Sequence, residues 1–253
     1  MVYSAIVSDW NGTLFQYPAD DVQNKKLAVA ASINDVLYLR LGSFYRLLKT
    51  KKRLHLMLEE YRAGKRPLQD LYDVFNREVL AGRSPEFVHR VIDQYARESA
   101  DKVDGRVLRP IRSEKSRGKT TAILSVSYDR SILKILERAG FSDVFGPGDV
   151  VANTLKLDGD GKVEGLTLGI YGKKPEIMEA EFFRGRGLRP ETTVYLDDTA
   201  DGEGVAQMLP EGNFIVPFLA SETSPDFAQR MASRHGAFVP ASEEDLARYL
   251  KSR

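Results

Sequence analysis

Three apolar runs in this sequence each lead into polar side chains that suit phosphate or metal chemistry. The runs and the residues that follow them are 5–7 with Asp9, 120–124 with Ser125, and 193–196 with Asp197 and Asp198. In open α/β sheets, ligands bind at the carboxyl ends of the strands. Lys174 stands between the second and third runs, at the start of a predicted helix. A carboxylate, a hydroxyl, a lysine and an acidic pair together suit an oxyanion and a cation.

The elements that must position these residues alternate between strands and helices. Besides the three runs, we expect short strands at 214–216 and 238–239, and helices over about 132–140, from Lys174 onward, and over 245–250. A hairpin is expected from 155 to 166, turning on the Asp-Gly pairs at 158–161. Strand–helix alternation predicts an α/β fold with a mostly parallel sheet and helices on both faces.

One long segment, from about Val22 to about Val103, has helical periodicity alone. Its apolar residues recur at spacings of three and four, which is typical of amphipathic helices. Ser84-Pro85 supplies a helix-start signal, and glycines and prolines punctuate the segment. The pattern predicts a helical insertion within the α/β fold.

The composition limits the classes of function to consider. Of 253 residues, 42% are apolar, and 37 basic against 36 acidic side chains leave a net charge of +1. Such a balance gives no global field for attracting nucleic acid or a membrane surface. The absence of cysteine excludes disulfides and thiol catalysis, and three scattered histidines argue against a histidine metal site. With no signal peptide or membrane-length apolar run, we expect a soluble cytoplasmic protein.

The stretch from Ser8 to Leu14, Ser-Asp-Trp-Asn-Gly-Thr-Leu, resembles the Asp-x-Asp-Gly-Thr-Leu nucleophile motif of the haloacid dehalogenase superfamily. Ser125, Lys174 and the pair Asp197-Asp198 resemble the other three motifs of that superfamily, in the same order. The resemblance implies a Rossmann-like three-layer core over 1–16 and 108–253, with a helical cap domain over 17–107.

A weaker likeness points to the phosphoserine-phosphatase branch of the superfamily. It rests on Asp149–Asn153, on the hairpin that ends near Gly165, and on the helical insertion. It does not extend to recognisable substrate residues within the insertion.

The resemblance also implies a Mg²⁺-dependent phosphatase that acts on a small phosphorylated metabolite. Asp9 would be the nucleophile and form an aspartyl-phosphate. Lys174 would supply positive charge, while the Ser125 hydroxyl and backbone amides of the Trp10–Thr13 turn would bind phosphoryl oxygens. Mg²⁺ would be held by Asp9, by the Asn11 carbonyl and by an acid from Asp197–Asp201.

The fourth motif allows two registers. Matching the Gly-Asp-Thr pattern of the superfamily favours Asp198 as the metal ligand, whereas matching the spacing to a following acid favours Asp197 with Asp201. We take Asp198 as the direct ligand and keep Asp197 and Asp201 as the rest of the acidic cluster.

The second and third motifs also have neighbouring candidates. Ser127 is the alternative to Ser125, although it lies two residues past the predicted end of the strand. Lys174 fits better than Lys173 because it directly precedes Pro175.

Asn11 departs from the superfamily motif, which has a second aspartate at this place. A carboxyl group there could protonate the leaving oxygen and later deprotonate the attacking water, each worth about 10²–10⁴-fold. An amide can do neither, so we expect slow phosphatase turnover. The alternative is a catalytically weak or inactive member that works by ligand or protein binding. A metal-free 2-haloacid dehalogenase is a further alternative, but it would give the acidic pair no purpose.

Overall fold

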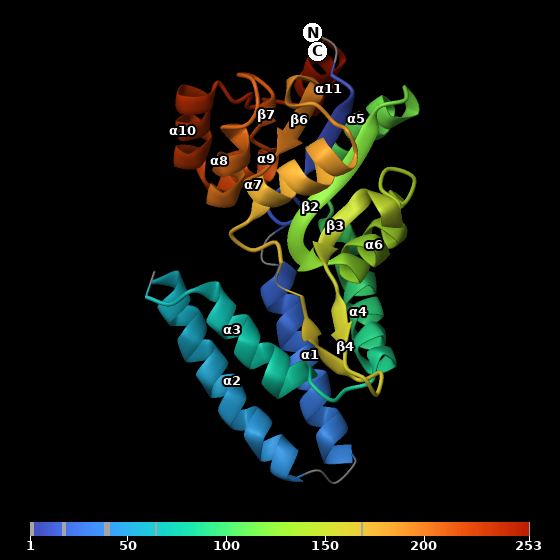
Figure 1. The fold of residues 1–253 in the computed structure, drawn as a ribbon, viewed down its shortest axis with the longest axis vertical. Coiled ribbons are helices and arrows are strands. Elements are labelled where there is room, and N and C mark those ends of the chain that lie inside the picture. Colours follow the sequence, from blue (N-terminus) through green and yellow to red (C-terminus); the bar gives the residue numbers. More distant parts are fainter. Residues whose placement is uncertain (1–2, 17–18, 38–40, 64, 168, 253) are drawn as a thin grey trace. The chain divides into compact units, whose positions relative to one another are not determined.

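The computed structural model describes residues 3–16, 19–37, 41–63, 65–167 and 169–252 (Figure 1). The chain forms two compact units. Unit 1 comprises Met1–Ala19, Ser99–Ala152 and Ile170–Arg253, and unit 2 comprises Asp20–Glu98 and Asn153–Gly169. The core limits of 1–16 and 108–253 and the cap limits of 17–107 stay a prediction.

Unit 1 is built on a five-stranded sheet in the order β3-β2-β1-β6-β7. Its strands are β1 (Ala5–Ser8), β2 (Thr120–Tyr128), β3 (Val150–Asn153), β6 (Thr193–Leu196) and β7 (Phe214–Ile215). Strand β1 pairs in parallel with β2 and β6, and β6 pairs in parallel with β7. The sheet confirms the predicted α/β class.

The helices of unit 1 surround this sheet (Figure 1). They are α5 (Gly105–Ser116), α6 (Asp129–Arg138), α7 (Lys174–Ile177), α8 (Ala200–Ala206), α9 (Phe218–Thr223), α10 (Pro225–His235) and α11 (Glu243–Ser252). A π-helical segment, Met178–Gly185, continues α7. All residues of β1 and β6 are buried, and successive strand residues point to opposite faces, so both faces of the sheet are covered there.

The strand order fixes where a ligand site is expected. The chain runs from β1 through β2 to β3 on one side, and then returns to place β6 on the other side of β1. The gap between β1 and β6 is therefore the topological switch point, where open α/β sheets bind ligands beyond the strand ends. Asp9 follows β1 and Asp197 follows β6, so both lie at this point.

The structure differs from the sequence prediction in three strands. Strand β2 was expected to end before Ser125, but it continues to Tyr128. Strand β3 was not among the expected strands, and residues 238–239 form only an isolated bridge from Phe238 to Ile215. Ser125 therefore lies inside the strand, where its hydroxyl accepts a hydrogen bond from the Ser127 amide at 3.3 Å.

Unit 2 combines helices with one antiparallel hairpin. Its elements are α1 (Ala19–Leu37), α2 (Leu41–Arg62), α3 (Leu68–Phe75), the π-helical η1 (Asn76–Leu80), α4 (Pro85–Ser99), β4 (Leu155–Leu157) and β5 (Val163–Leu166). The β4–β5 pairing confirms the predicted hairpin. Among the described residues, no helix is both long and apolar enough to cross a membrane.

The hairpin of unit 2 is bound to a distant part of the sequence. The side chain of Asn76 donates to the carbonyl of Leu166 and accepts from its amide, both at 3.0 Å. The Gly82 amide donates to the Val163 carbonyl at 2.9 Å, and the Val163 amide donates to the Arg83 carbonyl at 2.8 Å. The segment from residue 76 to residue 83 therefore forms hydrogen bonds along β5.

Candidate active site

Asp9 lies where β1 ends and the chain folds back on itself. Its amide donates to the Leu196 carbonyl of β6 at 2.8 Å, and its side chain is almost fully buried. The amides of Leu14 and Phe15 both donate to the Trp10 carbonyl, at 2.9 and 3.0 Å. Trp10 is buried and stacks on Phe15 with ring centroids 5.2 Å apart. The turn is therefore rigid and holds the Asp9 backbone at the switch point.

The turn after Asp9 differs in one respect from the sequence prediction. The amides of Gly12 and Thr13 were expected to bind phosphoryl oxygens. The Gly12 amide instead donates to the Phe15 carbonyl at 2.8 Å, and the Thr13 amide donates to the Trp10 carbonyl at 3.4 Å. These two donors stabilise the turn itself.

Gly12 is the one position of this turn that requires a glycine. Its φ is +71°, a conformation that L side chains rarely adopt. A Cβ at this position would lie 2.6 Å from Cγ of Asp198, and closer still to one carboxylate oxygen. The missing side chain therefore lets the turn approach the acidic pair that follows β6.

Lys174, the first residue of α7, joins the two strand ends. Its Nζ lies 3.1 Å from Oδ2 of Asp9 and 2.7 Å from Oδ2 of Asp197. It also donates to Oγ1 of Thr199 at 3.3 Å. All three charged side chains are buried, with Lys174 only 2% exposed. Of the two candidate lysines, Lys174 is thus the one that the structure brings to Asp9.

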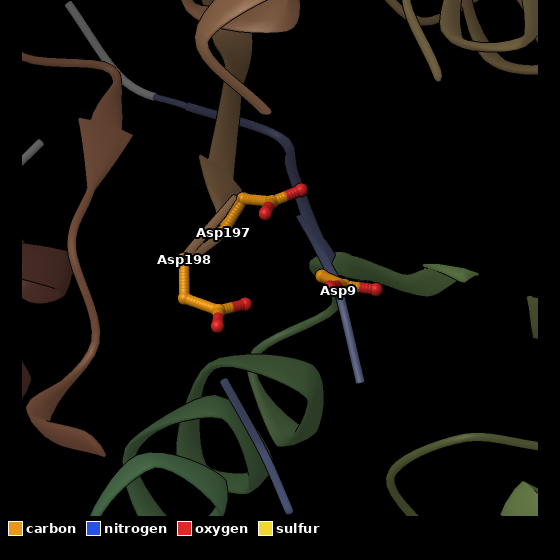
Figure 2. Close-up of side chains that lie close together, drawn as sticks. All are labelled: Asp9, Asp197 and Asp198. Atoms are coloured by element: carbon orange, nitrogen blue, oxygen red, sulfur yellow. The ribbon is translucent and has the colours of Figure 1, made fainter. Parts of the chain in front are cut away.

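The two acids of the pair after β6 have different surroundings. Asp197 is fully buried and accepts hydrogen bonds from Tyr195 and from Thr199, besides its ion pair with Lys174. Asp198 is partly buried, and its Oδ1 accepts a hydrogen bond from Oγ1 of Thr13 at 3.2 Å. Figure 2 shows that the two side chains leave the backbone in different directions, close to Asp9.

Asp201 has a different place from the other predicted acids. Its Oδ2 accepts a hydrogen bond from the Gly172 amide at 3.0 Å, in the loop that leads to Lys174. Among the described residues, the acidic group close enough to share a metal ion consists of Asp9, Asp197 and Asp198. The structure brings Asp201 to the Lys174 loop and not into this group.

Asn11 and the two candidate serines form a chain of hydrogen bonds. Nδ2 of Asn11 donates to Oγ of Ser127 at 2.8 Å, and the Ser127 amide donates to Oγ of Ser125 at 3.3 Å. Both serines are buried on β2. The structure therefore links Asn11 directly to Ser127, through the part of β2 that the sequence prediction left out of the strand.

The charges of the site shift the proton affinities of its groups. Burial raises the pKa of Asp9 to about 6, although the Lys174 ammonium opposes the shift. Burial, together with the carboxylates of Asp9 and Asp197, raises the pKa of Asp198 to about 8. Burial alone would lower the pKa of Lys174, but its two carboxylate partners raise it above the ordinary value. Lys174 therefore stays charged, and the acids carry an excess of negative charge.

The donor set of the site fits a hard divalent cation. One carboxylate oxygen from each of Asp9, Asp197 and Asp198 lies within 4.8 Å of the others. Carboxylate oxygens are the ligands that Mg²⁺ prefers, and a cation would offset charge that Lys174 alone leaves unbalanced.

Three side chains that hold the site were not predicted from the sequence. They are Thr13, Tyr195 and Thr199, which donate to the acidic pair. Thr13 lies within the nucleophile motif and Thr199 directly follows the acidic pair, so their positions in these two motifs could have marked them as site residues. Tyr195 lies within an apolar run, where a tyrosine is indistinguishable from an ordinary core residue.

Comparisons with solved structures support the fold. A substrate-bound phosphoserine phosphatase complex is 19% identical with a TM-score of 0.54, covering 88% of this chain and 90% of that chain. A protein of unknown function from Bordetella pertussis Tohama I is 15% identical with a TM-score of 0.66, covering 94% and 98%. Cytosolic 5′-nucleotidase IIIB bound to cytidine is 15% identical with a TM-score of 0.65, covering 98% and 86%. At these identities the likeness shows the fold alone.

Comparisons of the sequence itself identify the family. Among curated proteins, none matches this chain significantly. The family model described as haloacid dehalogenase-like hydrolase matches residues 6–203, which include the nucleophile motif, both serines, Lys174 and the acidic pair. The match confirms the predicted superfamily and the predicted hydrolase class. On this match and on the geometry of its switch point, the chain belongs to the haloacid dehalogenase-like hydrolase family.

Proposed function

We propose that this chain is a Mg²⁺-dependent phosphatase that hydrolyses a small phosphomonoester through an aspartyl-phosphate on Asp9. The observation that carries the proposal is that the two carboxylate oxygens of Asp9 have different contacts. Oδ2 is held 3.1 Å from Nζ of Lys174, while Oδ1 is buried and accepts no hydrogen bond from the described residues. A carboxylate that is fixed at one oxygen and free at the other suits attack on phosphorus.

The reaction has two displacements. Oδ1 of Asp9 attacks phosphorus, the bond from phosphorus to the ester oxygen breaks, and the leaving oxygen takes up a proton from solvent water. Water then attacks the phosphorus of the aspartyl-phosphate, which releases inorganic phosphate and restores the Asp9 carboxylate. Lys174 keeps Asp9 oriented and offsets phosphoryl charge in both steps. Mg²⁺ bound by Asp9, Asp198 and the Asn11 carbonyl would supply further charge neutralisation.

Asn11 limits the substrates that react quickly. Its amide is held by Ser127 and cannot transfer a proton to the leaving oxygen. Esters whose leaving groups are stable as anions, such as aryl phosphates, should therefore react faster than alkyl phosphates. The variant Asn11→Asp restores a carboxyl group and should raise turnover of alkyl phosphates by about 10²-fold or more. Turnover of aryl phosphates should change much less.

A catalytically weak or inactive protein that binds a phosphorylated ligand or a protein is the second candidate, because Asn11 removes the proton-transfer group. A metal-free dehalogenase receives no support, since it would use Asp9 as nucleophile but leave Asp198, clustered beside it, without a role.

The test is release of inorganic phosphate from a panel of aryl and alkyl phosphates, with Mg²⁺ and with EDTA. We expect Mg²⁺-dependent release that Asp9→Asn abolishes. Activity that survives Asp9→Asn would mean that Asp9 is not the nucleophile. No Mg²⁺-dependent release from any ester, by wild type or by Asn11→Asp, would favour the binding protein.

A further inference from the structure

A buried chain of three side chains runs from the interior of β6 to Asp9. The hydroxyl of Tyr195 donates to Oδ2 of Asp197 at 2.6 Å. The same oxygen accepts from Nζ of Lys174 at 2.7 Å, and that Nζ lies 3.1 Å from Asp9. Tyr195 and Asp197 are two residues apart, so they project from the same side of the strand. The chain therefore connects the rigid centre of the sheet to the Asp9 carboxylate.

Asp197 has its hydrogen-bonding capacity filled by protein donors. Oδ2 accepts from Tyr195 and Lys174, and Oδ1 accepts from the amide of Thr199 at 2.7 Å and from its hydroxyl at 2.6 Å. A carboxylate offers about four lone-pair sites, two on each oxygen. A cation at Asp197 would have to displace one of these four donors.

Asp198 presents the opposite case. Within the described part of the chain, the Asp198 carboxylate accepts one side-chain hydrogen bond, from Oγ1 of Thr13 to Oδ1 at 3.2 Å. Its side chain is partly exposed, whereas Asp197 is fully buried. Oδ2 of Asp198 also lies beside Gly12, whose missing side chain leaves room for it. A cation that approaches the pair therefore finds acceptor capacity on Asp198.

We infer that Asp197 is a positioning residue for Lys174 and not a cation ligand, and that Tyr195 and Thr199 act through it. The lysine side chain is long and flexible, so Asp9 and the 3.3 Å contact with Thr199 alone would leave its ammonium free to move. Asp197, fixed by three donors from β6 and the following loop, holds that ammonium beside Asp9. The role of Lys174 in the reaction rests on the proposed function, whereas the assignment of the cation to Asp198 does not.

The first test is Tyr195→Phe, which removes one hydroxyl and keeps the ring beside Phe214. We expect kcat on an aryl phosphate to fall by about 10-fold or more, with KM and the Mg²⁺ dissociation constant unchanged. The matched control is Tyr3→Phe. The Tyr3 hydroxyl also donates to a buried carboxylate, Glu114 at 2.9 Å, but Tyr3 precedes β1 at the opposite end from Asp9. This variant should lower the melting temperature similarly and leave kcat unchanged.

A conservative pair at Thr199 gives an independent check. Thr199→Ser keeps the hydroxyl and should keep kcat, whereas Thr199→Val removes it and should lower kcat as Tyr195→Phe does. If Tyr195→Phe retains the wild-type kcat, or if Tyr3→Phe loses as much, the positioning role is wrong.

The second test measures Mg²⁺ binding by calorimetry and needs no turnover. Asp197→Asn and Asp198→Asn each take one carboxylate charge away from the cation-bound site, so a loss that comes from charge alone affects both variants. We expect Asp198→Asn to weaken Mg²⁺ binding by about 10-fold more than Asp197→Asn. Equal losses, or a larger loss in Asp197→Asn, would make Asp197 a ligand and overturn the inference. If the wild type binds Mg²⁺ but releases no phosphate, the proposed function fails while this comparison still decides which acid holds the cation.

Discussion

Replacing Gly12 by alanine should separate the stability of the fold from the function of the site. The φ of +71° at Gly12 is costly for alanine, by about 1–2 kcal/mol in the free energy of unfolding. The new Cβ would also lie 2.6 Å from Cγ of Asp198, well inside the 3.0 Å below which something must shift. The Asp198 side chain would have to move, and a displacement of ~1 Å at a reacting site can cost about 10²-fold in rate.

Gly140→Ala is the matched control for this substitution. Gly140 has a similar φ of +77°, but a Cβ there would meet no atom within 4 Å. We therefore expect Gly140→Ala to lose about 1–2 kcal/mol in urea denaturation and Gly12→Ala to lose at least as much, because both place alanine in the left-handed region. Only Gly12→Ala should also weaken Mg²⁺ binding in calorimetry and lower phosphate release by about 10²-fold.

Two outcomes would refute this reasoning. If Gly12→Ala binds Mg²⁺ and turns over like the wild type, Asp198 does not need its observed position. If Gly140→Ala loses Mg²⁺ binding as well, the effect comes from the fold and not from the contact between Gly12 and Asp198.

Two further predictions concern the charges of the site. Lys174→Met leaves the buried carboxylates of Asp9 and Asp197 without their ammonium, so the free energy of unfolding should fall by about 3–5 kcal/mol at pH 7.5, and less at pH 5, where protonation relieves the repulsion. Urea denaturation at both pH values measures this, and a loss that does not depend on pH would contradict it. The pKa of Asp198 is about 8 in the fold against an ordinary 3.8, so the metal-free fold holds a proton that the unfolded chain has released, and its stability should fall as pH rises from about 4 to about 8. Mg²⁺ must displace that proton, so its affinity should rise by up to about tenfold per pH unit below pH 8, with proton release in calorimetry; an affinity independent of pH would refute the coupling.

The sequence predicts the fold class and the main site residues because their signals are local. An apolar run that ends in Asp9 is visible without any tertiary information, and so is Lys174 before a helix-starting proline. Parallel strands then bring such endings to one edge of the sheet, which is why Asp9, Lys174 and the acidic pair meet. Ser125 and Ser127 are neighbours on β2, and a hydrogen bond from Asn11 links Ser127 to the turn after Asp9.

The details that the sequence does not predict depend on tertiary hydrogen bonds. Strand β2 continues through Ser125 and Ser127 between its neighbours β1 and β3. The Ser127 hydroxyl accepts from Asn11, and the Ser125 hydroxyl accepts from the Ser127 amide; no pattern of residue types reveals such partners. Asp197 and Asp198 are adjacent in sequence, and only the donors around each side chain distinguish them. Tyr195 looks like a core residue until Asp197 is seen to accept from its hydroxyl.

The binding of β5 to the segment around Asn76 has a consequence for anyone who would exchange parts of this protein with a relative. The side-chain amide group of Asn76 bonds both the backbone N–H and the carbonyl of Leu166. A Cβ on Gly165 would lie 2.6 Å from Cγ of Asn76. If only residues 20–98 were replaced by those of a relative, β5 would lose the hydrogen bonds from Asn76. A different side chain at position 76 could also clash with the backbone at Gly165. The two stretches that make up unit 2 therefore depend on each other for their hydrogen bonds, and a chimera should exchange both together.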